Sequence, residues 1–361
     1  MLGDNSYVTI ILTKRCSLKC DYCFENAGPS GKEDWDVDTV ESCLAEAKSA
    51  GYKWVAITGG DPPTHPQFDD ILSVVERSGL NLFLETNGIL VTNALADRLA
   101  RFYATKDIRI QTSLDSETPS RHDRWRGQGA HAAAVKAIDK FVSRKLPVHV
   151  CKVVVPEDFA AVGFNLDSYV EFCRELGVVR VEVVRSVPMG RGEPAEFGMT
   201  QDQLRQARAY LETRPDFGLS GFVVSTHFNH ANSVASVEAG PRSLSAGQCR
   251  RLSGSDSGIV ANTDPADKGN WKLSPCAFLQ DVEIGQAGDL RRVVEGRIQK
   301  RMEGLRVAAM VGFEAETVWG CTECRPRFLK VLNEWQSLRL YDSALACGEP
   351  AASVPKTGVV R

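Results

Sequence analysis

YVTIILTKRCSLKCDYC, residues 7–23, is the stretch of sequence that decides the fold. Its first half, Tyr7 to Thr13, is a run of apolar and β-branched residues, which predicts a buried strand. Its second half places Cys16, Cys20 and Cys23 in one loop directly after that strand, with the spacing C-x-x-x-C-x-x-C. Three thiolates can each bind one iron of a 4Fe-4S cluster and leave the fourth iron open. A zinc knuckle or an ordinary ferredoxin cluster normally needs a fourth ligand, which is missing from this loop.

Outward from this stretch, short strands alternate with helices up to about residue 187. Further strands are predicted at Trp54 to Gly60, Asn81 to Gly88, Asp107 to Asp115, Pro147 to Pro156 and Val179 to Val187, and helices at Val37 to Ala50, Phe68 to Ser78, Thr92 to Phe102, Ala130 to Arg144 and Leu166 to Leu176. Successive right-handed crossovers imply a parallel sheet. Six strand-helix units are too few for a closed eight-stranded barrel, so we expect an α/β fold, a partial (β/α)6 TIM-type barrel with ligands at the carboxyl ends of its strands.

Composition excludes several other classes of protein. The chain has 361 residues, 43% of them hydrophobic, and a net charge of -3, which gives no support to a nucleic-acid partner. No signal peptide and no run long enough to span a membrane is visible, so no membrane partner is expected. Eleven cysteines without a secretory signal favour metal ligation in a reducing cytoplasm over a disulfide framework.

The composition of the sequence changes after Pro188, where predicted loops rich in Gly, Pro and Ser begin. We expect the barrel at residues 5–190, a connecting segment at 191–245, a small α+β domain at 246–340 and a tail at 341–361. A helix at Gln201 to Glu212 and a strand near Gly221 to Thr226 are predicted in the connecting segment. Short strands at Gly258 to Asn262 and Trp271 to Leu273 predict a hairpin in the small domain.

The cysteine spacing, with the aromatic Tyr22 before the third cysteine, resembles the hallmark of the radical S-adenosylmethionine (SAM) superfamily. Further segments resemble motifs of that family at the ends of successive strands: TGGDPP (58–63), ETNG (85–88), QTSLDS (111–116) and HDRWRG (122–127). RSVPMGRG (185–192) resembles the segment that passes the adenine, although a plain Gly-Pro loop reads equally well.

The resemblance implies that the open iron binds SAM and delivers an electron that cleaves it, giving a 5'-deoxyadenosyl radical that abstracts a hydrogen atom from the substrate. The residues that it assigns to SAM binding are Tyr22, Gly59, Gly60, Asp61, Asn87, Ser113, Asp115 and Arg126. Asp61 stands where the family usually has Glu, and Arg126 would neutralise the SAM carboxylate. A flavodoxin or ferredoxin would serve as the electron donor.

A second group of cysteines, Cys249, Cys276, Cys321 and Cys324, lies nearer the C-terminus. The segment SPCAFLQDVEIGQAGDL (274–290) resembles the auxiliary domains called SPASM and Twitch, and four cysteines suit the smaller Twitch form with one additional 4Fe-4S cluster. Zinc is the alternative. Cys249 either completes this auxiliary site or is a free thiol near the active site. Of the other cysteines, Cys43, Cys173 and Cys151 are expected in the core, with the barrel interior as an alternative for Cys151.

The first strand begins at Tyr7, which leaves no leader-binding domain before it and favours a small-molecule substrate. The chain also resembles enzymes of aminoglycoside antibiotic pathways, so epimerisation of the neomycin C to neomycin B type is expected, with Cys249 returning the hydrogen atom. Acidic side chains for an aminosugar would be Glu25, Glu85 and Glu182. The alternatives are an aminoglycoside alcohol dehydrogenase, a maturase of ribosomally made peptides, and an iron-sulfur or zinc protein without enzymatic activity.

Overall fold

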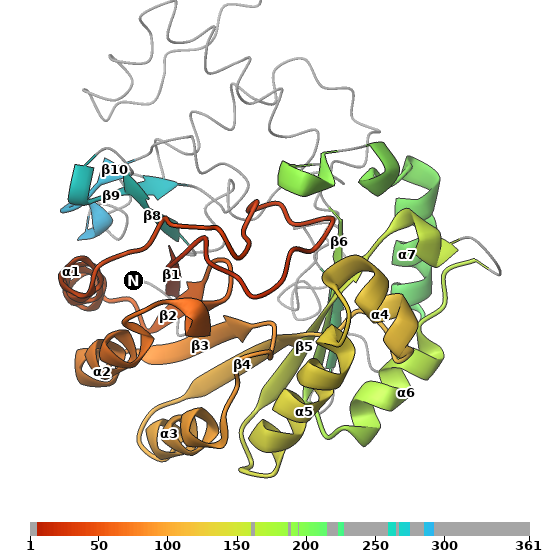
Figure 1. Cartoon of the computed structure of the whole chain (residues 1–361), viewed down its shortest axis with the longest axis horizontal. Coiled ribbons are helices and arrows are strands. Elements are labelled where there is room, and N and C mark those ends of the chain that lie inside the picture. Colours follow the sequence, from red (N-terminus) through yellow and green to blue (C-terminus); the bar gives the residue numbers. More distant parts are fainter. Residues whose placement is uncertain are drawn as a thin grey trace, which may run out of the picture.

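The computed structural model describes residues 6–159, 163–186, 189–193, 195–214, 223–226, 259–264, 267–274 and 285–291. The strands among these residues form one ten-stranded sheet in the order β10-β9-β8-β1-β2-β3-β4-β5-β6-β7. Figure 1 shows that this sheet is curved and that helices lie along its outer side.

Eight neighbouring strands of the sheet run parallel, from β8 through β1 to β7. Their bounds are β1 Tyr7–Ile11, β2 Trp54–Thr58, β3 Asn81–Thr86, β4 Ile108–Ser113, β5 Val148–Val154, β6 Arg180–Arg185, β7 Val223–Thr226 and β8 Ile259–Asp264. The antiparallel strands β9 (Asp267–Ser274) and β10 (Gly285–Gln286) extend the edge beyond β8. The helices are α1 Val37–Ser49, α2 Phe68–Ser78, α3 Asn93–Tyr103, α4 Pro119–Arg126, α5 Ala130–Val142, α6 Asp167–Glu175 and α7 Gln201–Glu212.

Helix α2 shows how local sequence sets these elements. Phe68, Ile71, Leu72 and Val75 recur at three- and four-residue spacing, and all four are buried. Gly79 then adopts a left-handed backbone conformation with φ of 73°, which ends the helix.

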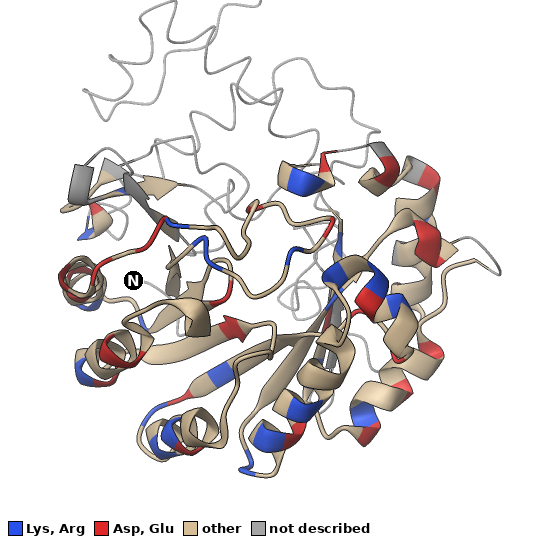
Figure 2. Ribbon diagram, viewed as in Figure 1, with Lys and Arg blue, Asp and Glu red and all other residues tan. Residues whose placement is uncertain are grey.

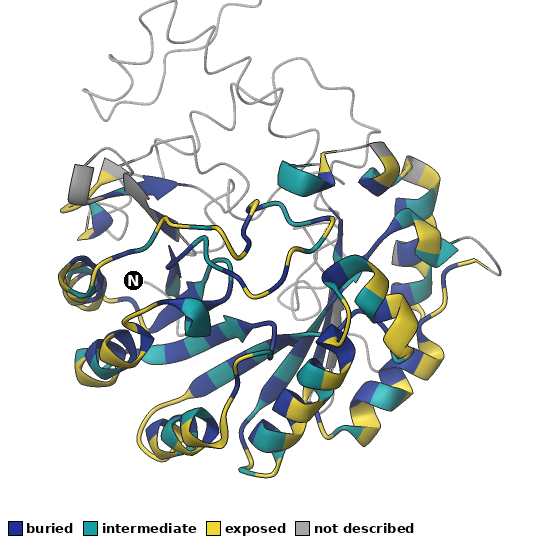
Figure 3. Ribbon diagram, viewed as in Figure 1, coloured by how far each residue is buried: buried dark blue, intermediate teal, exposed yellow. Residues whose placement is uncertain are grey.

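The sheet has one apolar face and one largely polar face. On β4 the residues Ile108 and Ile110 are buried and contribute to the main hydrophobic core, whereas Gln111 and Ser113 alternate with them and are half-buried. Burial alternates in the same way along β5. The buried positions coloured dark blue in Figure 3 accordingly lie along strands and inward helix faces. Figure 2 shows charges of both signs interspersed on the outer sides of the helices.

The expected α/β fold with a parallel sheet is confirmed, and most predicted elements agree with the structure within two residues at each end. Helix α4 is an addition that the sequence pattern did not predict. The expected hairpin is formed by β8 and β9, and β8 pairs in parallel with β1. These strands therefore continue the barrel sheet, while the proposed domain boundaries remain predictions. Every helix in the described ranges is too short or too polar to cross a bilayer.

Candidate functional site

The three cysteines predicted to bind iron occupy the loop that follows β1. Cys16 is buried, Cys20 and Cys23 are half-buried, and all three thiols are free. Cys20 and Cys23 pack with Cys16 against Leu18 and Ala27 in one small apolar group. In the described part of the chain, no three Cys, His, Asp or Glu side chains converge as they would around a single metal ion.

Two N–H groups point at the sulfur of Cys16. The backbone N–H of Leu18 and the Nδ2 of Asn87 each lie 3.4 Å from the Cys16 Sγ atom. Such donors stabilise a thiolate ligand, while burial raises the pKa of the metal-free Cys16 thiol to about 11. A bound metal removes this proton by coordination. The donor set of this loop therefore fits a thiolate-bound cluster, with Asn87 placed to support it.

Gly59 and Gly60, which follow β2, allow the backbone to approach the cysteine loop closely. The Gly60 N–H donates to the Thr13 carbonyl at 2.6 Å, and the Asp61 N–H donates to the Arg15 carbonyl at 2.8 Å. Gly59 has a φ of 137°, a conformation that residues with a side chain rarely adopt. A Cβ atom at Gly60 would overlap the Arg15 carbonyl group. These glycines thus seat the loop that carries the thiols.

Replacement of Gly60 by alanine should displace this loop, because the clash is with backbone atoms that have no rotamer to change. We expect a loss of about 1–3 kcal/mol of stability, the usual cost of overpacking, together with a lower iron content after anaerobic reconstitution. Gly28→Ala is the matched control, since a Cβ atom at Gly28 would meet only the Leu18 carbonyl oxygen at 4.0 Å. Equal iron contents in the two variants would contradict this explanation.

Asp61 has a carboxylate oxygen without a hydrogen-bond partner among the described residues. Its Oδ1 accepts hydrogen bonds from the Thr86 hydroxyl at 2.7 Å and from the Asn87 N–H at 3.1 Å. Its Oδ2 is buried and has no hydrogen-bond partner among the described residues. Burial raises the pKa of Asp61 to about 6, against the hydrogen bonds from Thr86 and Asn87. An ammonium group would supply the missing partner and lower this pKa.

Asp115 joins three separate parts of the chain. Its carboxylate accepts hydrogen bonds from Arg126 Nε at 2.7 Å and Arg126 Nη2 at 3.0 Å, from the Val153 N–H at 2.9 Å, and from the Tyr22 hydroxyl. We call these four residues the Asp115 network. It connects the cysteine loop, the end of α4 and strand β5 to Asp115, two residues after the end of β4.

The Asp115 network is buried, and the ion pair with Arg126 keeps Asp115 ionised. Asp115 is 5% exposed and Arg126 is 7% exposed. Burial opposes ionisation of Asp115, but Arg126 outweighs it with help from His122 and Lys152, so the pKa falls to about 2. Two N–H groups of Arg126 are thus committed to Asp115. The guanidinium also lies 5.4 Å from the centre of the Tyr22 ring.

Arg191 is a site residue that the sequence interpretation missed. Its Nε donates to the Cys20 carbonyl at 2.9 Å and its Nη2 to the Ala27 carbonyl at 2.6 Å, while its backbone N–H donates to the Cys23 carbonyl at 3.0 Å. Sequence reasoning treated the surrounding segment as either an adenine-passing segment or a plain loop. An arginine between two glycines was the available signal that the segment approaches another backbone closely.

Two of the three acidic residues predicted to bind substrate lie on the polar face of the sheet. Glu85 accepts a hydrogen bond from the Thr58 hydroxyl at 2.6 Å. Glu182 is opposite Cys151 in the register of β5 and β6. Cys151 alternates with buried core positions along β5, so it belongs to this polar face. The expected place in the core is therefore wrong for Cys151, and the alternative, the inner side of the barrel, agrees with the structure. The third acidic residue, Glu25, lies in the cysteine loop and forms an ion pair with Lys14.

Ser113 is at the end of β4 and pairs in register with Cys151. The four cysteines predicted to form the auxiliary site, Cys249, Cys276, Cys321 and Cys324, lie outside the described residues. Their roles, including a role for Cys249 as a hydrogen donor, stay predictions.

The fold and the site define a partial-barrel α/β protein with a three-cysteine loop at the carboxyl end of its first strand. Residues 10–160 match the family model of the radical SAM superfamily. This part of the chain belongs to that superfamily, as the cysteine spacing predicted.

Curated proteins match the chain over somewhat more than half of its length. The chain is 26% identical over 212 residues to a mycofactocin maturase of Mycobacterium tuberculosis, covering 58% of this chain and 52% of the relative. It is 30% identical over 214 residues to a PqqA peptide cyclase of Gluconobacter oxydans, covering 58% of each. An AdoMet-dependent heme synthase of Methanosarcina barkeri is 27% identical over 209 residues, covering 57% of each. The chain thus spans about half the length of these relatives.

Solved structures show the same fold over more of the chain. The structure described as anSMEcpe with bound AdoMet and Cp18Cys peptide matches with a TM-score of 0.60 at 15% identity, covering 94% of this chain and 98% of that one. Streptococcus suis SuiB bound to S-adenosylmethionine matches with a TM-score of 0.59 at 18% identity, covering 81% of this chain and 67% of that one. At these identities the likeness establishes the fold alone.

Proposed function

We propose that this protein is a radical SAM enzyme that modifies a peptide. The observation that carries the SAM-dependent part is the loop of Cys16, Cys20 and Cys23, which the family match includes. When bound, a 4Fe-4S cluster with an open iron supplies the electron that cleaves SAM and so starts radical chemistry on the substrate.

The residues of this chain have distinct tasks in that chemistry. The three thiolates hold the cluster, and Asn87 together with the Leu18 N–H supports the sulfur of Cys16. The Oδ2 atom of Asp61 would hold the ammonium group of bound SAM, which would give this buried oxygen the hydrogen-bond partner that it lacks. Asp115 fixes the plane of the Arg126 guanidinium, and the remaining N–H groups of Arg126 would pair with the carboxylate of bound SAM.

A peptide is a better proposal for the substrate than an aminoglycoside. Two of the relatives are named as a maturase and a peptide cyclase, and their names give the predicted aminoglycoside epimerisation no support. The polar face of the sheet carries the acidic residues Glu85 and Glu182 and the basic residues Arg109 and Arg180, so it presents both signs of charge. A surface of that kind suits the mixed polar groups of a peptide.

The decisive experiment combines substrate and cofactor readouts. Anaerobically reconstituted protein would be incubated with SAM, reduced flavodoxin and, in parallel, synthetic peptides encoded beside this gene or neomycin C. We expect 5'-deoxyadenosine with every mixture and a peptide lighter by two hydrogen atoms, as a new crosslink requires. In deuterium oxide, a neomycin epimer carrying one deuterium, with the peptides unchanged, would overturn the peptide assignment. If none of the mixtures released 5'-deoxyadenosine, the SAM-dependent assignment would be overturned as well.

A further inference from the structure

Lys152 is a buried lysine in the middle of strand β5. Its side chain is 5% exposed and lies on the same face of β5 as the core residues Val148, Val150 and Val154, the face that packs against the helices. Lysine is almost never buried so completely unless its charge is paired. The ammonium group must therefore have close partners in this otherwise apolar layer.

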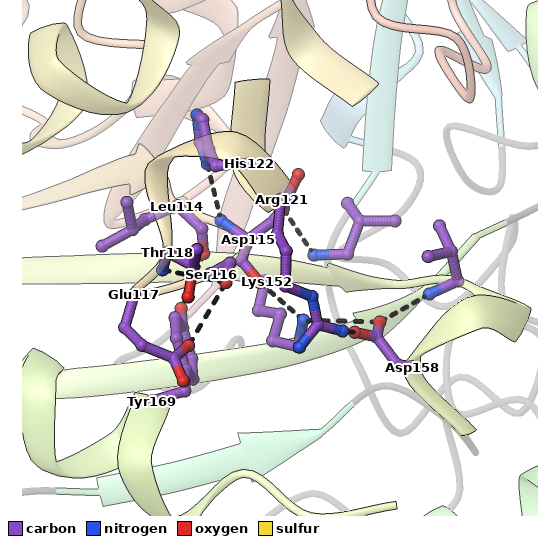
Figure 4. A network of polar contacts seen from close by, with 12 residues as sticks. Leu114, Asp115, Ser116, Glu117, Thr118, Arg121, His122, Lys152, Asp158 and Tyr169 are labelled. Atoms are coloured by element: carbon purple, nitrogen blue, oxygen red, sulfur yellow. Dashed lines mark hydrogen bonds and ion pairs between the residues drawn. The ribbon is translucent and has the colours of Figure 1, made fainter. Parts of the chain in front are cut away.

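Those partners are a backbone carbonyl and a carboxylate (Figure 4). The Lys152 Nζ donates to the Asp115 carbonyl oxygen at 2.6 Å and lies 3.3 Å from Oδ1 of Asp158. Asp158 in turn accepts from the Val155 N–H at 3.0 Å and from Arg121 at 3.2 Å. The carboxylate is thus held in place from two further directions, which fixes the position of the ammonium.

The contact with Asp115 distinguishes Lys152 from a simple buried ion pair. Lys152 binds the backbone carbonyl of Asp115, and its neighbour Val153 binds the carboxylate of the same residue. The Asp115 N–H donates to His122 Nδ1 at 3.0 Å, and the preceding carbonyl of Leu114 accepts from the Tyr169 hydroxyl at 2.6 Å. The main chain at Asp115 is consequently held from several sides, with β5 supplying two of the contacts.

We propose that Lys152 is a positioning residue for SAM: by fixing the main chain of Asp115, it sets the orientation of Arg126 and of the Tyr22 hydroxyl. The proposal rests on the SAM-dependent part of the proposed function and is independent of the peptide. Lys152 is bonded to the Asp115 network through the Asp115 carbonyl, and the sulfur of Cys16 keeps its own hydrogen bonds from Leu18 and Asn87. Its loss should therefore loosen SAM without releasing the cluster.

The test is Lys152→Met, which keeps the length of the side chain and removes the charge. Release of 5'-deoxyadenosine would be measured against SAM concentration in reconstituted full-length protein without peptide. We expect the KM for SAM to rise about tenfold, the lower end of the range for residues that orient a binding group, with kcat within about twofold and unchanged iron and sulfide. The electron paramagnetic resonance change that SAM causes in the reduced cluster should need correspondingly more SAM.

Arg98→Met is the control, because Arg98 is a half-buried cation that also pairs with two carboxylates, Asp69 and Glu76, but between α2 and α3. It should lose stability without a change in the KM for SAM. If Lys152→Met does not fold, Lys152→Met/Asp158→Asn leaves no unpaired buried carboxylate and should show the same rise in KM.

Each outcome has one meaning. A normal KM in a lysine variant, or loss of iron from both lysine variants, overturns the positioning role and leaves the proposed function standing. A wild-type protein that releases no 5'-deoxyadenosine overturns both.

Discussion

Replacement of Cys20 by alanine is expected to reduce SAM cleavage to the background rate. Cys20 is the middle thiol of the loop after β1, and two remaining thiolates do not hold a 4Fe-4S cube with one open iron. Burial already raises the pKa of the Cys20 thiol, although Arg126 opposes this rise. Its deprotonation therefore depends on coordination. The measurements are iron and sulfide content after anaerobic reconstitution and the yield of 5'-deoxyadenosine.

Cys43→Ala supplies the matched control for this result. Cys43 is fully buried in α1 among core residues, so its replacement removes the same sulfur atom from a position without a role in iron binding. This variant should lose some stability and keep its iron. A Cys20 variant that retained full iron and activity would exclude the loop as the catalytic cluster site, whatever the behaviour of Cys43→Ala.

Replacement of Asp115 by asparagine should cause the largest loss of stability of any single change in the site. The substitution leaves the buried Arg126 guanidinium without its counter-charge, which typically costs about 3–5 kcal/mol. The Tyr22 hydroxyl loses its carboxylate partner at the same time, so the cysteine loop is no longer tied to β4. Urea unfolding under anaerobic conditions measures the change in the free energy of unfolding.

The pH dependence of stability provides a second readout for the same residue. The pKa of Asp115 in the folded protein is about 2, below its ordinary value of 3.8, because Arg126 outweighs the effect of burial. Its contribution to stability is therefore complete above about pH 4 and is lost as the pH falls towards 2. The Asp115→Asn variant should lack this part of the acid transition.

Asp97→Asn is the control for the charge change, since Asp97 pairs with Arg144 at the surface, where its side chain is 53% exposed. Its unfolding midpoint should stay close to that of the wild type, because exposed pairs contribute little. Equal losses of stability in the two variants would mean that the Asp115 network does not hold the site together.

Local patterns in the sequence were sufficient to predict the helices and strands whose buried residues recur periodically. Helix α2 was predicted with its observed bounds because four apolar residues and a terminal glycine mark it. Helix α4 was missed because its buried residues are His122 and Arg126 rather than apolar ones. A helix stabilised by a buried ion pair has no apolar period to detect.

The candidate site was predictable in its residues but not in their connections. Asp115 and Arg126 were both identified from motifs, yet their pairing depends on α4 folding back towards the end of β4. Lys152 had a visible signal, since a lysine replaces an apolar residue on the core-facing side of β5. Its partner Asp158 could not be inferred, because nothing in the local pattern fixes the path of the turn after β5.

The pairing of β8 with β1 determines which fragments of this protein keep the paired strands of the sheet. A fragment cut at the bounds of the family match, residues 10–160, would lose residues 7–9 of β1 together with β8 beside it, and would lose β6 beside β5. Both margins would then expose unsatisfied backbone hydrogen-bonding groups, which invite aggregation. A fragment that keeps both margins paired must therefore run from residue 7 to residue 264, although the recognisable motifs end far earlier.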